Sequence, residues 1–277
     1  SRIIVLDNGV ISETGTHTDL LSGDGIYQSL YKNKFTDSPR DKKKPSESKQ
    51  LYVPEYEDED NASFVVDSWY KKSLWLYLLT PFSLLFTYLT NRRRKKFIKN
   101  KSLSYKSNVP IIIVGNITIG GTGKTPLVAY IAQELSKLGY KPGLVSRGYG
   151  GKFKETLQVN DETPVKKTGD EAQILAKLNL PFYIDKNRVR AVKTLVDNHD
   201  CDVIISDDGL QHYSMGRDIE IVLIDGKRRF GNNLTFPAGP LRESTTRLKD
   251  ADFIVNNSGP TQDDEYLMNI SPTKFVH

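Results

Sequence analysis

The sequence predicts an α/β fold: a doubly wound, mostly parallel β-sheet with helices on both faces, covering residues 109–277. Short apolar runs rich in β-branched residues recur between glycine-containing turns and helical stretches, at 111–114, 143–146, 203–206 and 219–224. Continuous apolar runs of this kind are typical of parallel strands that are buried on both faces. Their alternation with helical segments favours crossover connections and therefore a parallel sheet.

The composition fits a folded chain with a basic surface. Its 277 residues and 38% hydrophobic content suffice for one large domain or two. The formal charge of +5, from 39 Lys and Arg against 34 Asp and Glu, favours anionic partners such as nucleotides, phosphosugars or acidic lipid headgroups. We expect no nucleic acid among these partners. Cys201 is the only cysteine, which excludes a disulfide framework and a cysteine-based zinc site.

Residues 1–35 predict a hairpin followed by a short helix. Two apolar runs, 3–6 and 10–13, flank the turn residues Asn8 and Gly9, and a helical stretch follows from Thr18 to Lys34. The run Ile4-Val-Leu-Asp-Asn-Gly-Val-Ile-Ser-Glu-Thr-Gly-Thr-His17 resembles the C-terminal tail of an ABC transporter nucleotide-binding domain. The motifs with which that family binds nucleotide lie upstream of such a tail, so we expect no chemistry here. Without an initial Met or a secretory signal, the sequence is expected to begin inside a longer reading frame.

Residues 36–61 predict a disordered, charged linker. A basic block, Asp41-Lys-Lys-Lys-Pro-Ser-Glu-Ser-Lys49, precedes an acidic one, Glu55-Tyr-Glu-Asp-Glu-Asp60. A segment with so few apolar residues buries too little surface to offset the entropy lost on ordering. The alternative is a charged interaction tail.

Residues 62–108 predict a membrane-associated helix followed by a basic cluster. The stretch Ser73–Asn91 contains no charged residue, which is near the minimum of about 20 residues for a bilayer span. Pro81, aromatic residues along the whole stretch and the basic run Arg92-Arg-Arg-Lys-Lys96 favour a bent helix in the cytoplasmic leaflet over a full span. The alternative is a buried core helix of a soluble domain.

A glycine-rich loop links the first strand of the predicted sheet to a helix. The run Gly115-Asn-Ile-Thr-Ile-Gly-Gly-Thr-Gly-Lys-Thr-Pro126 places Lys124 and Thr125 where that helix begins. Phosphates bind where glycines permit close backbone approach to N–H donors at a helix N-terminus. Lys124 would bridge the β and γ phosphates of a nucleotide, and the Thr125 hydroxyl would ligate Mg²⁺. The nucleotide-binding residues are therefore predicted to be Gly120, Gly121, Thr122, Gly123, Lys124 and Thr125.

This pattern predicts a P-loop NTPase-like fold, with one departure. The usual motif has a glycine at the position of Thr118, so its spacing is broken here. A second element supports the prediction: the apolar run 203–206 ends in Asp207 and Asp208. Carboxylates at the end of such a strand lie beside Mg²⁺ and the nucleotide phosphates in P-loop folds.

Five motifs in this order resemble the tetraacyldisaccharide 4′-kinases of lipid A biosynthesis, and the resemblance covers about residues 62–277. The motifs are Gly120-Gly-Thr-Gly-Lys-Thr-Pro126, Ser146-Arg-Gly-Tyr-Gly-Gly151, Gly169-Asp-Glu171, Asp207-Asp-Gly-Leu-Gln-His212 and Pro237-Ala-Gly-Pro-Leu-Arg-Glu243. The resemblance implies that ATP phosphorylates the 4′-hydroxyl of a tetraacylated glucosamine disaccharide 1-phosphate. It also implies contact with lipids at the cytoplasmic face of the inner membrane.

The resemblance also implies roles for individual residues. The family's catalytic aspartate matches Asp170, which would help to deprotonate the attacking hydroxyl, although a helix N-cap is compatible with the same position. Arg188 would act on the phosphates in catalysis together with Lys124. Gln211 and His212 would shape the surroundings of a metal held by Thr125, Asp207 and Asp208. The substrate contacts would come from Arg147, Tyr149, Arg242 and Glu243.

The family pairs its catalytic aspartate with a histidine from its C-terminal part. His277 lies outside any matching motif, so we expect that histidine beyond the end of the sequence. Two alternatives remain open. One is a nucleotide-dependent switch or metallochaperone-type P-loop protein, which the aberrant glycine spacing favours. The other is an inactive join of a transporter tail to a shortened kinase.

Overall fold

The computed structural model describes residues 3–7, 10–15, 17–23, 25, 28, 60–71 and 73–270. The chain divides into two compact units, Ser1–Glu59 with Ser271–His277, and Asp60–Ile270. In the first unit, β1 (Ile3–Asp7) pairs antiparallel with β2 (Val10–Gly15), and α1 (His17–Ser22) follows. The predicted hairpin is confirmed, whereas the helix predicted to reach Lys34 is described only to Ser22. Residues 36–59 of the predicted linker and His277 lie outside the described residues.

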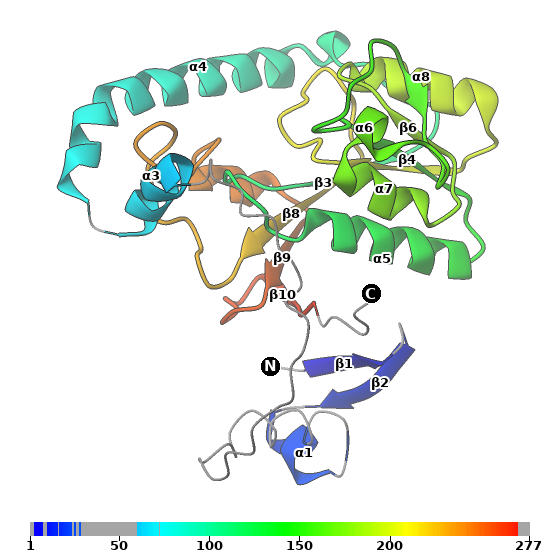
Figure 1. Cartoon of the computed structure of the whole chain (residues 1–277), viewed down its shortest axis with the longest axis horizontal. Coiled ribbons are helices and arrows are strands. Elements are labelled where there is room, and N and C mark those ends of the chain that lie inside the picture. Colours follow the sequence, from blue (N-terminus) through cyan, green and yellow to red (C-terminus); the bar gives the residue numbers. More distant parts are fainter. Residues whose placement is uncertain are drawn as a thin grey trace, which may run out of the picture. The chain divides into compact units, whose positions relative to one another are not determined.

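The second unit is built on a sheet of eight strands in the order β10-β9-β8-β3-β7-β4-β6-β5 (Figure 1). All neighbouring strands are parallel except β5 and β6. The predicted fold class is therefore confirmed. The strands are β3 (Ile111–Gly115), β4 (Pro142–Ser146), β5 (Leu157–Gln158), β6 (Phe182–Ile184), β7 (Val203–Asp207), β8 (Ile219–Asp225), β9 (Phe253–Asn257) and β10 (Glu265–Met268).

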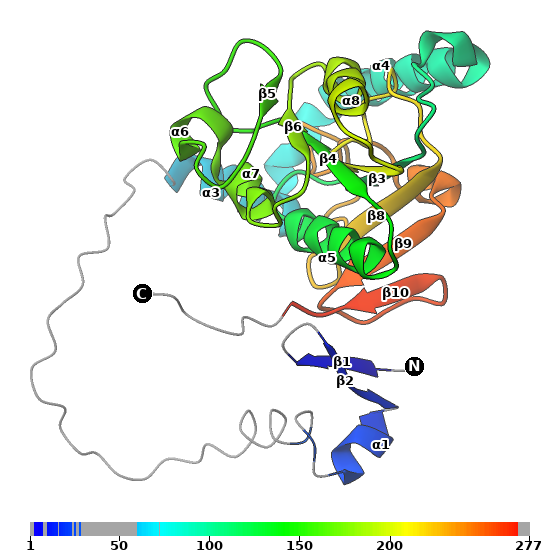
Figure 2. The same ribbon diagram turned by 90° about the vertical axis from the view of Figure 1, so that its right-hand side faces the viewer.

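Two hydrophobic cores lie on opposite faces of this sheet because side chains alternate along each strand. Ile111 and Ile113 of β3 belong to one core, and Ile112 and Val114 belong to the other. Helix α8 (Arg188–Asn198) covers the first face, and α5 (Lys124–Lys137) with α7 (Asp170–Ala176) covers the second (Figure 2). Burial on both faces explains why these strands read as continuous apolar runs.

Two short helical segments complete this part of the fold near the site. Helix α6 (Val165–Thr168) directly precedes α7, and the 3₁₀ segment η3 (Thr245–Asp250) precedes β9. The η3 residue Leu248 packs against the core that α8 covers.

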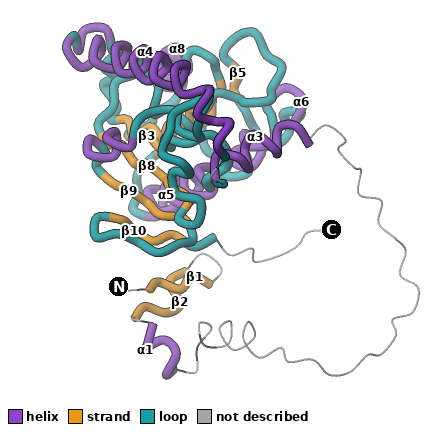
Figure 3. The backbone as a smooth tube through the Cα atoms, turned by 90° about the vertical axis from the view of Figure 1, so that its left-hand side faces the viewer, coloured by secondary structure: helices purple, strands orange, loops and turns teal. Residues whose placement is uncertain are grey.

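The apolar stretch near residue 73 forms two elements instead of one bent helix. The 3₁₀ segment η1 (Leu74–Leu79) is followed by α4 (Thr80–Lys99), and η2 (Lys101–Leu103) comes next. Pro81 occupies the first turn of α4, where its missing N–H removes no helical hydrogen bond. The proline therefore starts a helix here. Upstream, α3 (Asp60–Tyr70) begins within the last residues of the predicted linker (Figure 3).

One side of α3 and α4 is fixed to the loop Thr235–Ala238. The Trp69 indole N–H donates to the carbonyl of Pro237 at 3.1 Å. The Ser83 hydroxyl donates to the Thr235 carbonyl at 2.8 Å, and it accepts from the backbone N–H of Ala238 at 2.9 Å. These contacts tie both helices to the stretch that carries the motif ending in Glu243.

The other side of η1 and α4 presents large apolar side chains to the outside. Leu78, for example, is 79% exposed. The other strongly exposed members are Leu74, Tyr77, Phe82, Leu84, Leu85, Tyr88 and Leu89. Among the described helices none alone meets the length and hydropathy of a membrane span, but Phe64–Tyr70 and Leu74–Lys99, bent by 96°, meet them as a pair.

Candidate functional site

Five of the predicted site residues, Lys124, Arg188, Asp207, Asp208 and Arg242, lie together near the edge where β3 and β7 end. In the parallel pair of β3 and β7, Val114 lies opposite Asp207, so the glycine loop and the paired carboxylates leave the sheet side by side. Ser146 at the end of β4 lies opposite Ile184 at the end of β6. Ligands of open α/β sheets bind at this carboxyl edge.

The glycine loop turns sharply from β3 into α5. Gly120 and Gly123 have φ angles of 103° and 91°, values that L side chains rarely adopt. At Gly123 a Cβ atom would lie 2.8 Å from the Asn257 side-chain nitrogen, so glycine is also needed for space. Helix α5 then begins at Lys124, and the side chain of Thr125 is buried in its first turn. The loop thus brings backbone N–H groups to a helix N-terminus, as phosphate binding requires.

Three charged side chains form a row beside this loop. The Asp208 carboxylate lies 3.5 Å from Lys124 Nζ and accepts hydrogen bonds from Arg242 Nη1 at 3.1 and 3.2 Å. Burial opposes the charged form of Asp208, but the charges of Lys124 and Arg242 outweigh it and hold the pKa of that carboxyl below its usual value. Asp208 therefore positions two cations where phosphate would bind.

Asp207 is the buried member of the carboxylate pair, with only 2% of its surface exposed. Burial raises the pKa of Asp207 to about 7, although the charge of Lys124 opposes the rise. Its Oδ1 atom has no hydrogen-bond partner. An unpaired buried carboxylate oxygen beside a phosphate loop fits a Mg²⁺ ligand, because oxygen donors are those that this ion prefers.

Two of the other predicted metal residues, Asp208 and Gln211, already have partners. Gln211 donates from its side-chain amide to the Asn116 carbonyl at 3.0 Å, and Asp208 is paired as described. Among the residues that the structure describes, no cluster of three or more His, Cys, Asp or Glu side chains is arranged to hold a metal. Asp207 and the Thr125 hydroxyl are the best-suited of the four residues, and the metal roles of Thr125, Asp207, Asp208 and Gln211 all stay predictions.

Arg188 is buried against the backbone of the paired aspartates, with 2% of its surface exposed. Its guanidinium donates to the carbonyls of Asp185 at 2.9 Å, Asp207 at 3.4 Å and Asp208 at 3.5 Å. Burial lowers the pKa of Arg188 to about 10, against the opposing charges of Asp208 and Asp207. Arg188 remains a cation at neutral pH and holds the backbone that carries both carboxylates.

Asp170 stands at the start of α7, on an exposed rim of the site. Gly169 is the N-cap residue and Asp170 lies in the first turn, so the N-cap alternative for Asp170 is wrong. A Cβ atom at Gly169 would lie within 1.9 Å of the Tyr149 carbonyl, which shows how tightly the loop 147–151 packs here. Arg147 and Tyr149 are exposed on that loop, and the charge of Arg147 lowers the pKa of Arg188.

The structure places Glu243 apart from Arg242, in a buried cluster. Its carboxylate accepts a hydrogen bond from the Tyr213 hydroxyl and lies 3.5 Å from Arg247 Nε. Burial raises the pKa of Glu243. The Glu243 carboxylate therefore has a structural role in this buried cluster. Its predicted contact with substrate stays a prediction.

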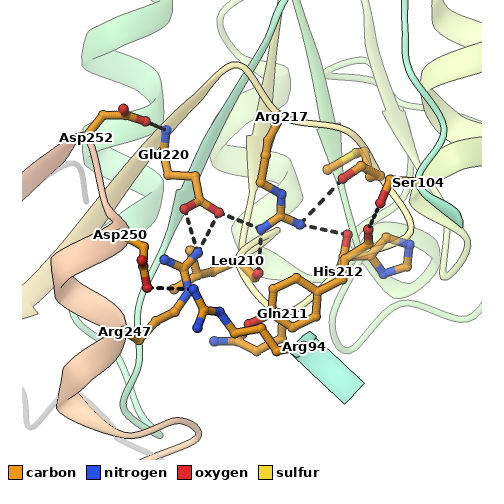
Figure 4. A network of polar contacts seen from close by, with 12 residues as sticks. Arg94, Ser104, Leu210, Gln211, His212, Arg217, Glu220, Arg247, Asp250 and Asp252 are labelled. Carbon is orange, nitrogen blue, oxygen red and sulfur yellow. Dashed lines mark hydrogen bonds and ion pairs between the residues drawn. The ribbon is translucent and has the colours of Figure 1, made fainter. Parts of the chain in front are cut away.

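A network of polar contacts extends this cluster around the loop that follows Asp208 (Figure 4). Arg217 donates to the carbonyls of Leu210 at 2.9 Å and His212 at 3.0 Å and to Glu220 Oε1 at 2.6 Å. Arg247 also binds Glu220, at 2.5 Å. Burial, with the nearby charge of Arg188, lowers the pKa of His212 to about 4, so this histidine is neutral at pH 7. By binding the carbonyls of Leu210 and His212, the network fixes the loop that follows Asp207 and Asp208.

Two polar side chains from outside the glycine loop, and Asn116 within it, contact its backbone carbonyls. Arg228 Nη2 donates to the Gly121 carbonyl at 2.5 Å, and Asn257 Nδ2 donates to the Thr122 carbonyl at 2.9 Å. Asn116 Nδ2 donates to the Gly120 carbonyl at 3.4 Å and to the Thr122 hydroxyl at 3.2 Å. No local pattern in the sequence indicated Arg228 or Asn257, since the first lies four residues after a predicted strand and the second ends a strand, β9, that was not predicted.

Comparison with known proteins identifies a family match over most of the chain. The family model described as LpxK, tetraacyldisaccharide-1-P 4'-kinase, matches residues 75–276. A tetraacyldisaccharide 4'-kinase of Shewanella denitrificans is 49% identical over 209 residues, 75% of this chain and 63% of that protein. One of Vibrio parahaemolyticus is 46% identical over the same length, 62% of that protein. The matched part of the chain thus spans less than two thirds of these relatives.

A solved structure supports the same relationship. The structure of LpxK from Aquifex aeolicus in complex with ATP aligns with a TM-score of 0.60 and 32% sequence identity. The alignment covers 66% of this chain and 59% of that one.

Proposed function

The chain belongs to the tetraacyldisaccharide-1-P 4'-kinase family, and from this premise we propose that it acts in the ATP-dependent phosphorylation of a lipid A precursor. The acceptor would be the 4′-hydroxyl of a tetraacylated glucosamine disaccharide 1-phosphate. The observation that carries the proposal is the meeting of the glycine loop, Lys124 and the paired aspartates at one sheet edge.

The phosphates of ATP would bind at the glycine loop and the first turn of α5. The N–H groups of that turn lack helical partners, and they carry the positive end of the helix dipole. Lys124 would give up its ion pair with Asp208, or keep it while also contacting phosphate. In either case it would neutralise charge on the transferred phosphoryl group. Arg242, held on the same carboxylate, supplies a second cation next to the loop.

The site suits the magnesium ion that accompanies ATP. Asp207 with its unpaired Oδ1 and the Thr125 hydroxyl would hold it. When bound, Mg²⁺ neutralises charge on the phosphate oxygens. A cation would also favour the ionised form of Asp207, which burial disfavours in its absence.

Asp170 would accept the proton of the sugar hydroxyl as its oxygen bonds to phosphorus and ADP departs. Its place on the exposed rim leaves it open to an acceptor that approaches from outside. Arg147 and Tyr149, on the neighbouring loop, would contact that acceptor. Arg188 would hold the backbone of Asp207 and Asp208 in position and would add positive charge next to these carboxylates.

The exposed apolar face of η1 and α4 would contact the inner membrane at its cytoplasmic face, where the acceptor resides. Side chains such as Leu78 and Phe82 supply apolar area, and Arg92, Lys95 and Lys96 supply positive charge for anionic headgroups. Ser83 of α4 and Trp69 of α3 are bonded to the loop that leads to Arg242. The lipid acceptor would therefore arrive close to the nucleotide.

Transfer of label from [γ-³²P]ATP to the tetraacyl disaccharide 1-phosphate tests the proposal. We expect a labelled lipid with the unsubstituted protein and very little with Lys124→Ala. Label appearing only as inorganic phosphate would contradict the kinase and support a nucleotide-dependent switch.

A further inference from the structure

The glycine loop is held from outside by side chains that come from two neighbouring strand ends. Arg228 follows β8 and bonds the Gly121 carbonyl, and Asn257 ends β9 and bonds the Thr122 carbonyl. Asn116, at the start of the loop, makes a longer contact with the Gly120 carbonyl. Three successive carbonyls of the loop thus have side-chain donors.

This pattern has a geometric consequence for the backbone. A peptide group is planar and trans, so its C=O and its N–H point in opposite directions. Fixing the carbonyls of Gly121 and Thr122 toward Arg228 and Asn257 turns the N–H groups of Thr122 and Gly123 the other way. Successive N–H groups that point to one side form a concave anion-binding site.

Arg228 is itself held in place. Its Nε donates to Asp225 Oδ2 at 2.6 Å, and its backbone N–H donates to Asp225 Oδ1 at 2.9 Å. Its guanidinium also lies 5.8 Å from the centre of the Tyr70 ring, within the range of a cation–π contact. The arginine therefore meets the loop in a fixed orientation, with part of its charge balanced by Asp225.

We propose that Arg228 and Asn257 are positioning residues that orient the phosphate-binding N–H groups of the glycine loop. This inference rests on the proposed nucleotide function and adds residues that no motif of the loop contains. Arg228 acts here through the loop carbonyl and not as a phosphate ligand.

The test compares Arg228→Ala, Arg228→Lys and Asn257→Ala with Lys227→Ala, the loss of an exposed cation next to Arg228. Dissociation constants for Mg-ATP and for AMP are measured by calorimetry. We expect Arg228→Ala and Asn257→Ala each to weaken Mg-ATP binding by about tenfold, as for the loss of one hydrogen bond with a charged or well-placed donor. AMP binding should change far less, and Lys227→Ala should match the unsubstituted chain.

Two outcomes separate positioning from simple charge. Arg228→Lys keeps the charge without the planar guanidinium, so we expect it to restore only part of the affinity. Asn257→Ala removes no charge, so an effect there comes from the loop carbonyl. Full affinity in Arg228→Lys together with full affinity in Asn257→Ala would overturn the proposal.

Hydrogen exchange on the nucleotide-free protein provides an independent measurement. The peptide that covers residues 116–127 should exchange faster in Arg228→Ala and Asn257→Ala than in Lys227→Ala. Unchanged exchange in both variants would refute the positioning role. If exchange rises as expected while the unsubstituted chain binds no Mg-ATP, the nucleotide function is refuted and the loop contacts stand.

Discussion

Lys124 Nζ lies 3.5 Å from Asp208 Oδ1, and Arg242 binds the same carboxylate. One acidic side chain thus holds two cations at the mouth of the glycine loop before any phosphate is present. Positioned cations stabilise the charge of a transferring phosphoryl group without rearranging during the reaction. In the proposed function, Asp208 would therefore position both cations for the transferred phosphoryl group.

We expect Lys124→Ala to lower the rate of lipid phosphorylation by about a hundredfold or more, because it removes one preorganised electrostatic stabiliser. The measurement is the initial rate at saturating ATP. Lys137→Ala at the other end of α5 is the matched control, since Lys137 pairs with Glu134 within the helix. A rate near that of the unsubstituted protein in Lys124→Ala would remove the glycine loop from the mechanism.

Asp208→Asn should weaken Mg-ATP binding even though it removes a negative charge near phosphates. Without the carboxylate, Lys124 and Arg242 lose the partner that holds them together. We expect a loss of about tenfold or more in affinity, because a hydrogen bond to a charged group contributes about 1.5–3 kcal/mol. Tighter binding of Mg-ATP by this variant would show that Asp208 acts mainly by repulsion.

Asp207→Asn should stabilise the nucleotide-free protein at alkaline pH. The folded pKa of Asp207 is about 7, above its ordinary value of 3.8, so the unfolded chain loses the proton first. Stability linked to Asp207 is complete below pH 3.8 and declines as pH rises through about 7. We expect the variant to melt higher at pH 8, and to melt higher by a clearly smaller margin at pH 5, with Mg²⁺-dependent ATP binding weakened. An equal difference at both pH values would contradict the buried, unpaired carboxylate.

Asp170→Asn should lower kcat for lipid phosphorylation by about 10²- to 10⁴-fold, the usual contribution of general-base assistance. The KM for ATP should stay within about threefold, since Asp170 has no proposed contact with the nucleotide. Asp161→Asn, another exposed aspartate upstream of α7, serves as the control. If the two variants behave alike, Asp170 is not the base.

Replacing Leu78, Phe82 and Leu85 with serine should release the protein from vesicles that contain anionic phospholipid. Each side chain is more than half exposed, so the fold should survive. The control variant is Leu138→Ser. Leu138 is the C-cap residue of α5 and is 73% exposed, but it is not part of the apolar face of η1 and α4. Vesicle co-sedimentation at high salt distinguishes apolar contact from headgroup charge. Undiminished sedimentation of the triple variant would place the membrane contact elsewhere.

The sequence by itself determined the fold class and the chemistry of the loop. Continuous β-branched runs are readable because strands buried on both faces need apolar residues at every position. Glycines followed by Lys124 and Thr125 are readable because phosphate binding constrains neighbouring residues in the chain. The family followed from the order of five such local motifs, and the match over residues 75–276 confirms it.

Tertiary structure decided which side chains face one another. That Asp208 holds Lys124 and Arg242, while Glu243 turns into a buried cluster with Tyr213, depends on contacts between segments far apart in the chain. The pKa of Asp207 depends on burial, which no local pattern reports. Arg228 and Asn257 were invisible for the same reason. Each acts on a loop more than a hundred residues away, which it reaches because β8 pairs with β3 and β9 pairs with β8 in the folded sheet.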